Sequence, residues 1–249
     1  MKIYAIYNIK GGVGKTTSAV NLAYLSAAEG ARTLLWDLDH QGSASYYLCV
    51  KPKIEGGAKE LIEGRLNVNS LLRMTGYPNL DLFPSDISYR RMDQALEEEK
   101  DRPSRVVGKL LKPVAKHYDN LFLDCPPGLS LLAETIFGLC DVLLVPMIPT
   151  TLSLRAYNRL VRFLVDKGYN RRMRVLPFFT LVHPDKPIHR VVTANVREKH
   201  PVFLKTIIPD SNIIEAMGVK RSPIFTYARQ TPDANSYRDL WAEIKERSG

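Results

Sequence analysis

The feature that most constrains the fold of this chain is a glycine-rich segment close to its N-terminus. Residues 2–7 are apolar and typical of a buried β-strand, and a helical pattern begins at Thr16. Between them lies the string Lys10-Gly11-Gly12-Val13-Gly14-Lys15-Thr16-Thr17. A glycine loop that joins a strand to a helix is the setting of a phosphate-binding loop, whose backbone N–H groups point inward at phosphate oxygens. The sequence therefore predicts that this loop binds the phosphates of a nucleotide.

Two side chains of the loop have predicted roles of their own. Lys15 is expected to reach the β- and γ-phosphates, and the hydroxyl of Thr16 is expected to ligate Mg²⁺. Both follow from their positions directly after the last glycine and at the start of the helix. The loop thus predicts a magnesium–nucleotide complex as its ligand.

Short apolar runs alternate with helical patterns along the rest of the chain. Further strands are predicted at residues 33–36, 80–83, 121–123, 141–146 and 175–181, and helices at about 16–29, 102–117, 130–139, 151–167 and 191–199. Residues 44–76 show weak periodicity and are expected to form a loop with a short helix. This alternation is typical of an α/β fold with a mostly parallel twisted sheet flanked by helices. No linker interrupts it, so one domain over residues 1–249 is predicted.

Acidic residues follow two of the predicted strands. Asp37 and Asp39 come after the strand at 33–36, and Asp124 comes after the strand at 121–123. Ligands of open α/β sheets bind at the carboxyl ends of the strands, and a buried carboxylate without a cation is costly. We therefore expect these three carboxylates beside the phosphate loop.

The loop also departs from the general phosphate-loop pattern, because Ile9 replaces the first glycine and Lys10 follows it. In this form it resembles the deviant Walker A loop of the ParA/MinD family of ATPases. Three further segments are similar to motifs of that family. They are Asp37-Leu38-Asp39-His40-Gln41-Gly42, with His40 where proline is usual; Asp124-Cys125-Pro126-Pro127-Gly128; and a tail made of Ile207-Ile208-Pro209, Glu215-Ala216 and Ser222-Pro223-Ile224. The resemblance spans nearly the whole chain.

The resemblance implies a set of roles and cofactors. ATP and Mg²⁺ are the implied cofactors, with Lys10 reaching across an ATP-sandwich homodimer to the partner's phosphates. Asp39 would orient the attacking water, Asp37 and Asp124 would support the magnesium shell through water, and Pro209 would contribute to nucleotide binding. Lys10, Lys15, Asp39 and Asp124 are thus the implied catalytic residues of an ATPase that is slow until a partner accelerates it.

The formal net charge of +9 is confined to the C-terminal part of the chain. Residues 1–150 hold 17 Lys/Arg and 17 Asp/Glu, whereas residues 151–249 hold 18 against 9. A one-sided basic field favours a polyanion, and here we expect salt-dependent DNA binding without sequence preference. The residues of the predicted basic face are Arg155, Arg159, Arg162, Arg171, Arg172, Lys186, Arg190, Lys220 and Arg221.

The function favoured at this stage is that of a ParA-like positioning ATPase in the cytoplasm, associated with the nucleoid. Its ATP-bound dimer would coat DNA, and a ParB-like or other adaptor would trigger hydrolysis. Its cargo could be a plasmid, a chromosome or a protein assembly such as a carboxysome.

Two alternatives stay open. A MinD-like membrane-surface switch would use Tyr237, Leu240, Trp241 and Ile244 on lipid, although their spacing favours a helix packed on the sheet. A synthetase that phosphorylates a carboxylate would need a specific substrate pocket. The apolar run at 142–148 is too short to span a bilayer, so no membrane insertion is expected. The three cysteines, Cys49, Cys125 and Cys140, are predicted to be reduced, buried thiols.

Overall fold

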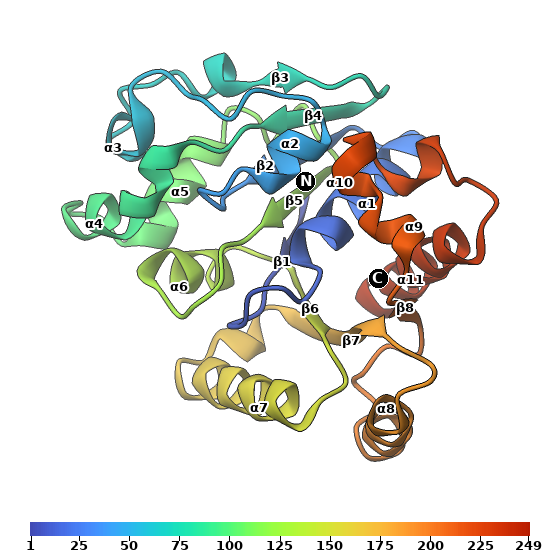
Figure 1. Cartoon of the computed structure of the whole chain (residues 1–249). Helices are drawn as coiled ribbons and strands as arrows, with labels where there is room; N and C mark the ends of the chain where they lie inside the picture. Colours follow the sequence, from blue (N-terminus) through green and yellow to red (C-terminus); the bar gives the residue numbers. More distant parts are fainter.

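An eight-stranded sheet forms the middle of the molecule in the computed structural model, which describes all 249 residues (Figure 1). Its order is β3-β4-β2-β5-β1-β6-β7-β8, and every neighbouring pair is parallel except β3 with β4. The strands are β1 (Lys2–Ile6), β2 (Thr33–Asp37), β3 (Arg73–Met74), β4 (Leu80–Phe83), β5 (Asn120–Asp124), β6 (Val142–Met147), β7 (Arg174–Val182) and β8 (Ile207–Pro209). The predicted α/β fold with a mostly parallel sheet is confirmed.

Helices cover both faces of this sheet (Figure 1). Strand residues alternate between the two cores: in β1, Tyr4 and Ile6 face one, and Ala5 faces the other. The first core includes α1 (Lys15–Ala28), α2 (Ser43–Tyr47), α9 (Asn212–Glu215), α10 (Met217–Lys220) and α11 (Pro232–Ser248). The second includes α3 (Gly57–Ile62), α4 (Met92–Glu97), α5 (Pro103–Leu111), α6 (Leu131–Phe137), α7 (Thr151–Asp166) and α8 (Pro187–Lys199).

Strand register brings three chain segments to one point at the carboxyl edge of the sheet. Asp124 of β5 is paired with Ile6 of β1 on one side and with Asp37 of β2 on the other. The phosphate loop leaves β1 at the same level, because β1 ends at Ile6 and α1 begins at Lys15. The fold therefore places the loop and the acidic residues together.

Several element boundaries differ from the predicted ones. Helix α5 ends at Leu111 rather than near His117, since Pro113 has no N–H to continue the helical ladder. Helix α8 begins at Pro187 rather than at residue 191, with proline at the favoured first helical position. Strands β3 and β8, only two and three residues long, were not predicted.

Residues 44–76 are more ordered than their sequence pattern indicated. They contain α3, most of α2, the 3₁₀ turn η1 (Val68–Leu71) and β3. Ile54, Leu61 and Leu71 are buried in the second core. Short elements of this kind give too few turns for a periodic signal, although their apolar residues still reach the core.

The last helix, α11, is packed into the first core. Tyr237, Leu240, Trp241 and Ile244 are at most 3% exposed, and the Trp241 indole N–H donates a hydrogen bond of 3.0 Å to Glu29. The core interpretation of these four residues is confirmed. None of the helices is long and apolar enough to cross a bilayer.

The cysteine prediction is confirmed for two residues and wrong for the third. Cys125 and Cys140 are buried, but Cys49 is exposed. Cys49 follows α2 with a left-handed backbone (φ 57°), which turns it outward towards the end of α10.

Candidate nucleotide-binding site

The phosphate loop has the backbone conformation that its glycines permit. Gly12 and Gly14 both lie in the left-handed region, with φ of 69° and 76°. A side chain at either position would be strained, so glycine is required for the curl of the loop. Gly14 is also the N-cap of α1, so the loop ends at the positive end of that helix.

Two side chains outside the motif hold the loop in place. The amide of Asn8 donates to the carbonyl of Pro146 (2.8 Å) and its oxygen accepts from Lys10 N (2.9 Å). On β7, the hydroxyl of Thr180 donates to the carbonyl of Val13 (2.8 Å). Neither Asn8 nor Thr180 was singled out from the sequence, because only the fold shows that they touch the loop.

Lys15 lies inside the loop, and its side chain is directed back along it. The residue is 7% exposed, and its ammonium donates to the carbonyl of Lys10 at 3.2 Å. Burial lowers the pKa of Lys15, while the charges of Asp124 and Asp39 oppose that change. A poorly solvated ammonium at this position is suited to phosphate oxygens, which restore the interactions lost with water.

Two adjacent carboxylates are buried at the foot of the loop. Both oxygens of Asp124 lack a hydrogen-bond partner, and so does one oxygen of Asp37. Burial raises the pKa of both groups, and the charge of Asp37 adds to the effect on Asp124. Nearby Thr16 and Lys15 partly oppose the rise for Asp124. Unpaired carboxylate oxygens beside a threonine hydroxyl are the donors that Mg²⁺ prefers, so these residues fit a magnesium ion.

The other oxygen of Asp37 is fixed by Ser45 on α2. The backbone N–H and the hydroxyl of Ser45 both donate to it at 2.7 Å. The same hydroxyl accepts from Ser85 N (3.0 Å), and the hydroxyl of Ser85 donates to the carbonyl of Asp39. Two fully buried serines, not predicted as site residues, therefore connect the carboxylate of Asp37 to the backbone of Asp39.

The carboxylate of Asp39 is only partly exposed, at 15%. It accepts a hydrogen bond from Gln41 N at 3.0 Å, and the Nδ1 of His40 lies 3.7 Å away. Asp39 thus has a fixed backbone and a side chain that keeps free acceptor capacity. These are the properties needed to orient a water molecule.

The segment after β5 is tied to the phosphate loop. Gly128 has φ of 94°, and its N–H donates to the carbonyl of Ile9 at 3.1 Å. Its own carbonyl accepts from the hydroxyl of Tyr7 at 2.8 Å. These hydrogen bonds therefore hold the Asp124–Gly128 motif against the residues that lead into the phosphate loop.

The C-terminal motif is anchored on α1. Asn21 of α1 donates to the sulfur of Met217 (3.2 Å) and accepts from Ile224 N (3.0 Å). Pro209 lies at the end of β8, three strands from β1 in the sheet order. Its role in nucleotide binding stays a prediction.

The predicted basic residues fall into separate groups. Arg155, Arg159 and Arg162 share one groove along α7, with Leu129 from the segment after β5. Lys186 and Arg190 lie at the start of α8, where Arg190 is inside the helix rather than beside it. Lys220 and Arg221 lie at the end of α10, over the other core (Figure 1). Arg171 and Arg172 line a further cavity.

Arg221 is already engaged within the chain. Its guanidinium lies 4.5 Å from the ring centre of Tyr46 on α2, and its Nε donates to the carbonyl of Tyr46 at 3.3 Å. The thiol of Cys49 donates to the carbonyl of Arg221 at 3.4 Å. Arg221 therefore contacts the helix that follows the Asp37–Gly42 segment.

A parallel sheet with a glycine loop between β1 and α1, a buried loop lysine and paired carboxylates defines a P-loop nucleotide-binding protein. A family model described as an AAA domain matches residues 1–175. The chromosome-partitioning ATPase Soj of Treponema pallidum is 31% identical over 255 residues, covering 100% of this chain and 98% of the relative. The chain belongs to the ParA/MinD family of ATPases, as the motifs predicted.

Solved structures share the fold. Apo McdA of Cyanothece has a TM-score of 0.83 at 22% identity, with 100% of both chains covered. Cobyrinic acid a,c-diamide synthase of Mycobacterium smegmatis, with an ATP analog and magnesium bound, has a TM-score of 0.82 at 24% identity, over 97% of this chain and 93% of that one. Proteins of different function thus share this architecture, so the fold alone does not decide the function.

Proposed function

We propose that this chain is a ParA-like positioning ATPase. ATP joins two copies into a dimer, the dimer binds DNA without sequence preference, and an adaptor protein stimulates hydrolysis and releases the dimer. The full-length similarity to a chromosome-partitioning ATPase supports the partition branch over a synthetase.

The site residues divide the work of hydrolysis. The loop amides and Lys15 bind the β- and γ-phosphates, while Thr16, Asp37 and Asp124 hold the magnesium shell. Magnesium supplies charge neutralisation at the phosphates when it is bound. Asp39, held at its backbone by Ser85, orients the water that attacks the γ-phosphate.

Lys10 carries the argument for a dimer. Its backbone is fixed by Asn8 and by the Lys15 ammonium, but its own side chain has no hydrogen bond or ion pair within the protomer. A lysine whose backbone is fixed and whose ammonium group is unpaired can contact phosphates bound by a second copy of the chain. Because that cation arrives only with the partner, turnover depends on dimerisation.

The basic residues support DNA as the surface to which the ATP-bound dimer binds. Those on α7, α8 and α10 are exposed, and phosphate neutralisation by such residues gives sequence-independent, salt-dependent binding. A lipid-binding role for α11 has less support, because its apolar face is already packed in the core.

The test measures retention of the purified protein on non-specific duplex DNA and on anionic liposomes, with ATP or ADP. We expect retention on DNA with ATP alone, together with a change from monomer to dimer by light scattering. Lys15→Ala should abolish both. Retention on liposomes only, or a monomer that binds DNA equally with ATP and ADP, would overturn the proposal.

A further inference from the structure

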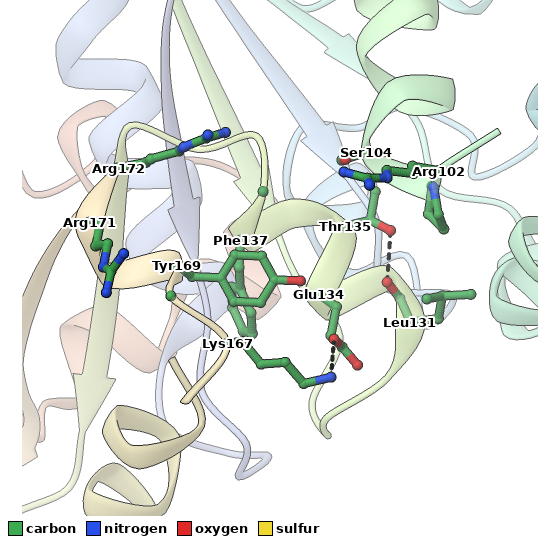
Figure 2. A pocket seen from close by; sticks show the side chains of 13 residues that line it. Arg102, Ser104, Leu131, Glu134, Thr135, Phe137, Lys167, Tyr169, Arg171 and Arg172 are labelled. Atoms are coloured by element: carbon green, nitrogen blue, oxygen red, sulfur yellow. Dashed lines mark hydrogen bonds and ion pairs between the residues drawn. The ribbon is translucent and has the colours of Figure 1, made fainter. Parts of the chain in front are cut away.

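A hollow lies between the start of α5, α6 and the end of α7 (Figure 2). None of its lining residues belongs to the phosphate loop. Its volume is about 610 Å³. The wall is built from the start of α5, one side of α6, the end of α7 and the 3₁₀ turn η3 (Tyr169–Arg171). Pockets that hold drug-sized ligands span about 300–1,000 Å³, so the volume suits a small molecule.

The cavity is strongly cationic. Arg102, Lys167, Arg171 and Arg172 line it, and Glu134 is its one acidic residue. Glu134 is paired with Lys167 at 3.5 Å, the ion pair that Figure 2 marks. None of the three arginines has an ion-pair partner in the chain.

The lack of partners is not due to a shortage of acidic residues. Asp101 directly precedes Arg102, yet it pairs with Lys109 (2.6 Å) and Arg105 (3.5 Å). The two cations of α5 that do not line the cavity are thus paired, whereas Arg102, which lines it, is not. Three guanidinium groups without an ion-pair partner leave the hollow with an uncompensated positive charge, which favours the binding of an anion.

The polar and aromatic groups of the wall narrow the ligand class. Guanidinium groups match the geometry of phosphate oxygens, and Ser104 and Tyr169 add hydroxyls. The rings of Tyr169 and Phe137 lie 5.9 Å apart on one side. We propose that this cavity binds a ligand carrying two or more phosphate groups, independently of the nucleotide at the phosphate loop. Such groups occur in a free polyphosphate compound and in the DNA backbone.

The inference goes beyond the ATPase, so the tripolyphosphate measurement is made in a Lys15→Ala background that removes the phosphate-loop lysine. The duplex measurement is made with the natural phosphate loop and with ATP, because DNA retention is proposed to need the ATP-bound dimer. Calorimetry measures binding of inorganic tripolyphosphate, and fluorescence anisotropy measures binding of a labelled 20-bp duplex. The cavity variant is Arg102→Ala/Arg171→Ala. The matched control is Arg155→Ala/Arg159→Ala, which removes the same charge from the groove on α7.

We expect the cavity variant to lose about tenfold or more in affinity for a phosphate ligand, while the control changes less than about threefold for tripolyphosphate. Loss of tripolyphosphate binding identifies a free polyphosphate as the source, and a selective loss of duplex binding identifies the DNA backbone. Equal binding by both variants to both probes overturns the proposal. A poly-glutamate peptide serves as a third probe. If the cavity variant loses affinity for this peptide but not for the two phosphate probes, the cavity binds carboxylates and the proposal is overturned.

Discussion

The phosphate-loop edge and the basic surface are built on opposite principles. At the edge, Lys15, Asp37 and Asp124 are buried, and each is placed by specific contacts or by strand register. On the basic surface, the arginines and lysines are exposed and distributed over several elements on both sides of the sheet. The nucleotide site therefore depends on the identity of single residues, whereas the proposed DNA-binding surface depends on the number and arrangement of its charges.

The strongest expected contrast is between the two loop lysines. Lys15→Ala should weaken binding of ATP to the monomer by on the order of 100-fold, since a charge-assisted contact inside a buried loop is lost. Lys10→Ala should leave monomer binding within about threefold but abolish the ATP-dependent dimer, because its side chain has no partner within the protomer. Calorimetry and light scattering check the pair. Equal loss of ATP affinity in both variants would show that Lys10 acts within its own subunit.

The Asp39→Ala substitution tests whether ATP binding and ATP turnover depend on different residues of the site. Loss of a group that orients water should lower the hydrolysis rate by about 100-fold or more, while ATP still forms the dimer. Single-turnover phosphate release, measured next to dimerisation, reports both. Turnover at the wild-type rate would remove Asp39 from its role.

Asp124→Asn should separate stability from function. Because burial raises the pKa of Asp124, its ionised form opposes folding, so its contribution to stability is greatest in acid and is lost as pH rises through the folded-state pKa. In nucleotide- and metal-free protein at neutral pH, the asparagine variant should unfold at a higher denaturant concentration, with a gain of about 1–3 kcal/mol. It should also bind magnesium–ATP poorly. Destabilisation of the metal-free protein at neutral pH would contradict the burial argument.

The Ser85→Ala substitution tests how far turnover depends on the hydrogen bond that holds the backbone of Asp39. Removing the hydroxyl releases the carbonyl of Asp39, and we expect kcat to fall about tenfold with KM nearly unchanged. Ser85→Thr should restore much of the rate. Ser70→Ala, at an exposed serine, is the control. A rise in KM with unchanged kcat would assign Ser85 to nucleotide binding instead.

The smallest effect is expected on the basic surface. A single change, Arg155→Ala, should weaken DNA binding by about two- to threefold and reduce the salt slope by about one, because one phosphate contact is lost. Removing Arg155, Arg159 and Arg162 together should have a much larger effect. Titration at several salt concentrations distinguishes this behaviour from a single dominant arginine, whose loss alone would abolish binding.

The sequence was most informative where a function is encoded within a few adjacent residues. The loop from Lys10 to Thr17 and the aspartates at the carboxyl ends of β2 and β5 were predictable, because strand ends and glycines fix their geometry locally. Asn8, Ser45, Ser85 and Thr180 were not, since each acts through a contact with a distant or unremarkable segment. Strand β8 has three residues, too few for a periodic pattern.

The arginines show the same limit from the other side. The structure places Arg155, Arg159 and Arg162 along one groove of α7, whereas the sequence could not reveal that Arg171 and Arg172 line a separate cavity. It also could not show that Cys49 is exposed, because a left-handed residue after a short helix leaves no pattern.

The packing of Arg221 on Tyr46 has a mechanical consequence. Helix α2 begins directly after Gly42, and the arginine that ends α10 rests on the ring and carbonyl of Tyr46. If α2 shifts when Asp37 or Asp39 changes its interactions, then either the end of α10 moves with it or the contact between Arg221 and Tyr46 is broken. The surface at Lys220 and Arg221 is thus mechanically coupled to the carboxyl edge of the sheet. The coupling runs through α2 and α10, two helices that are far apart in the chain.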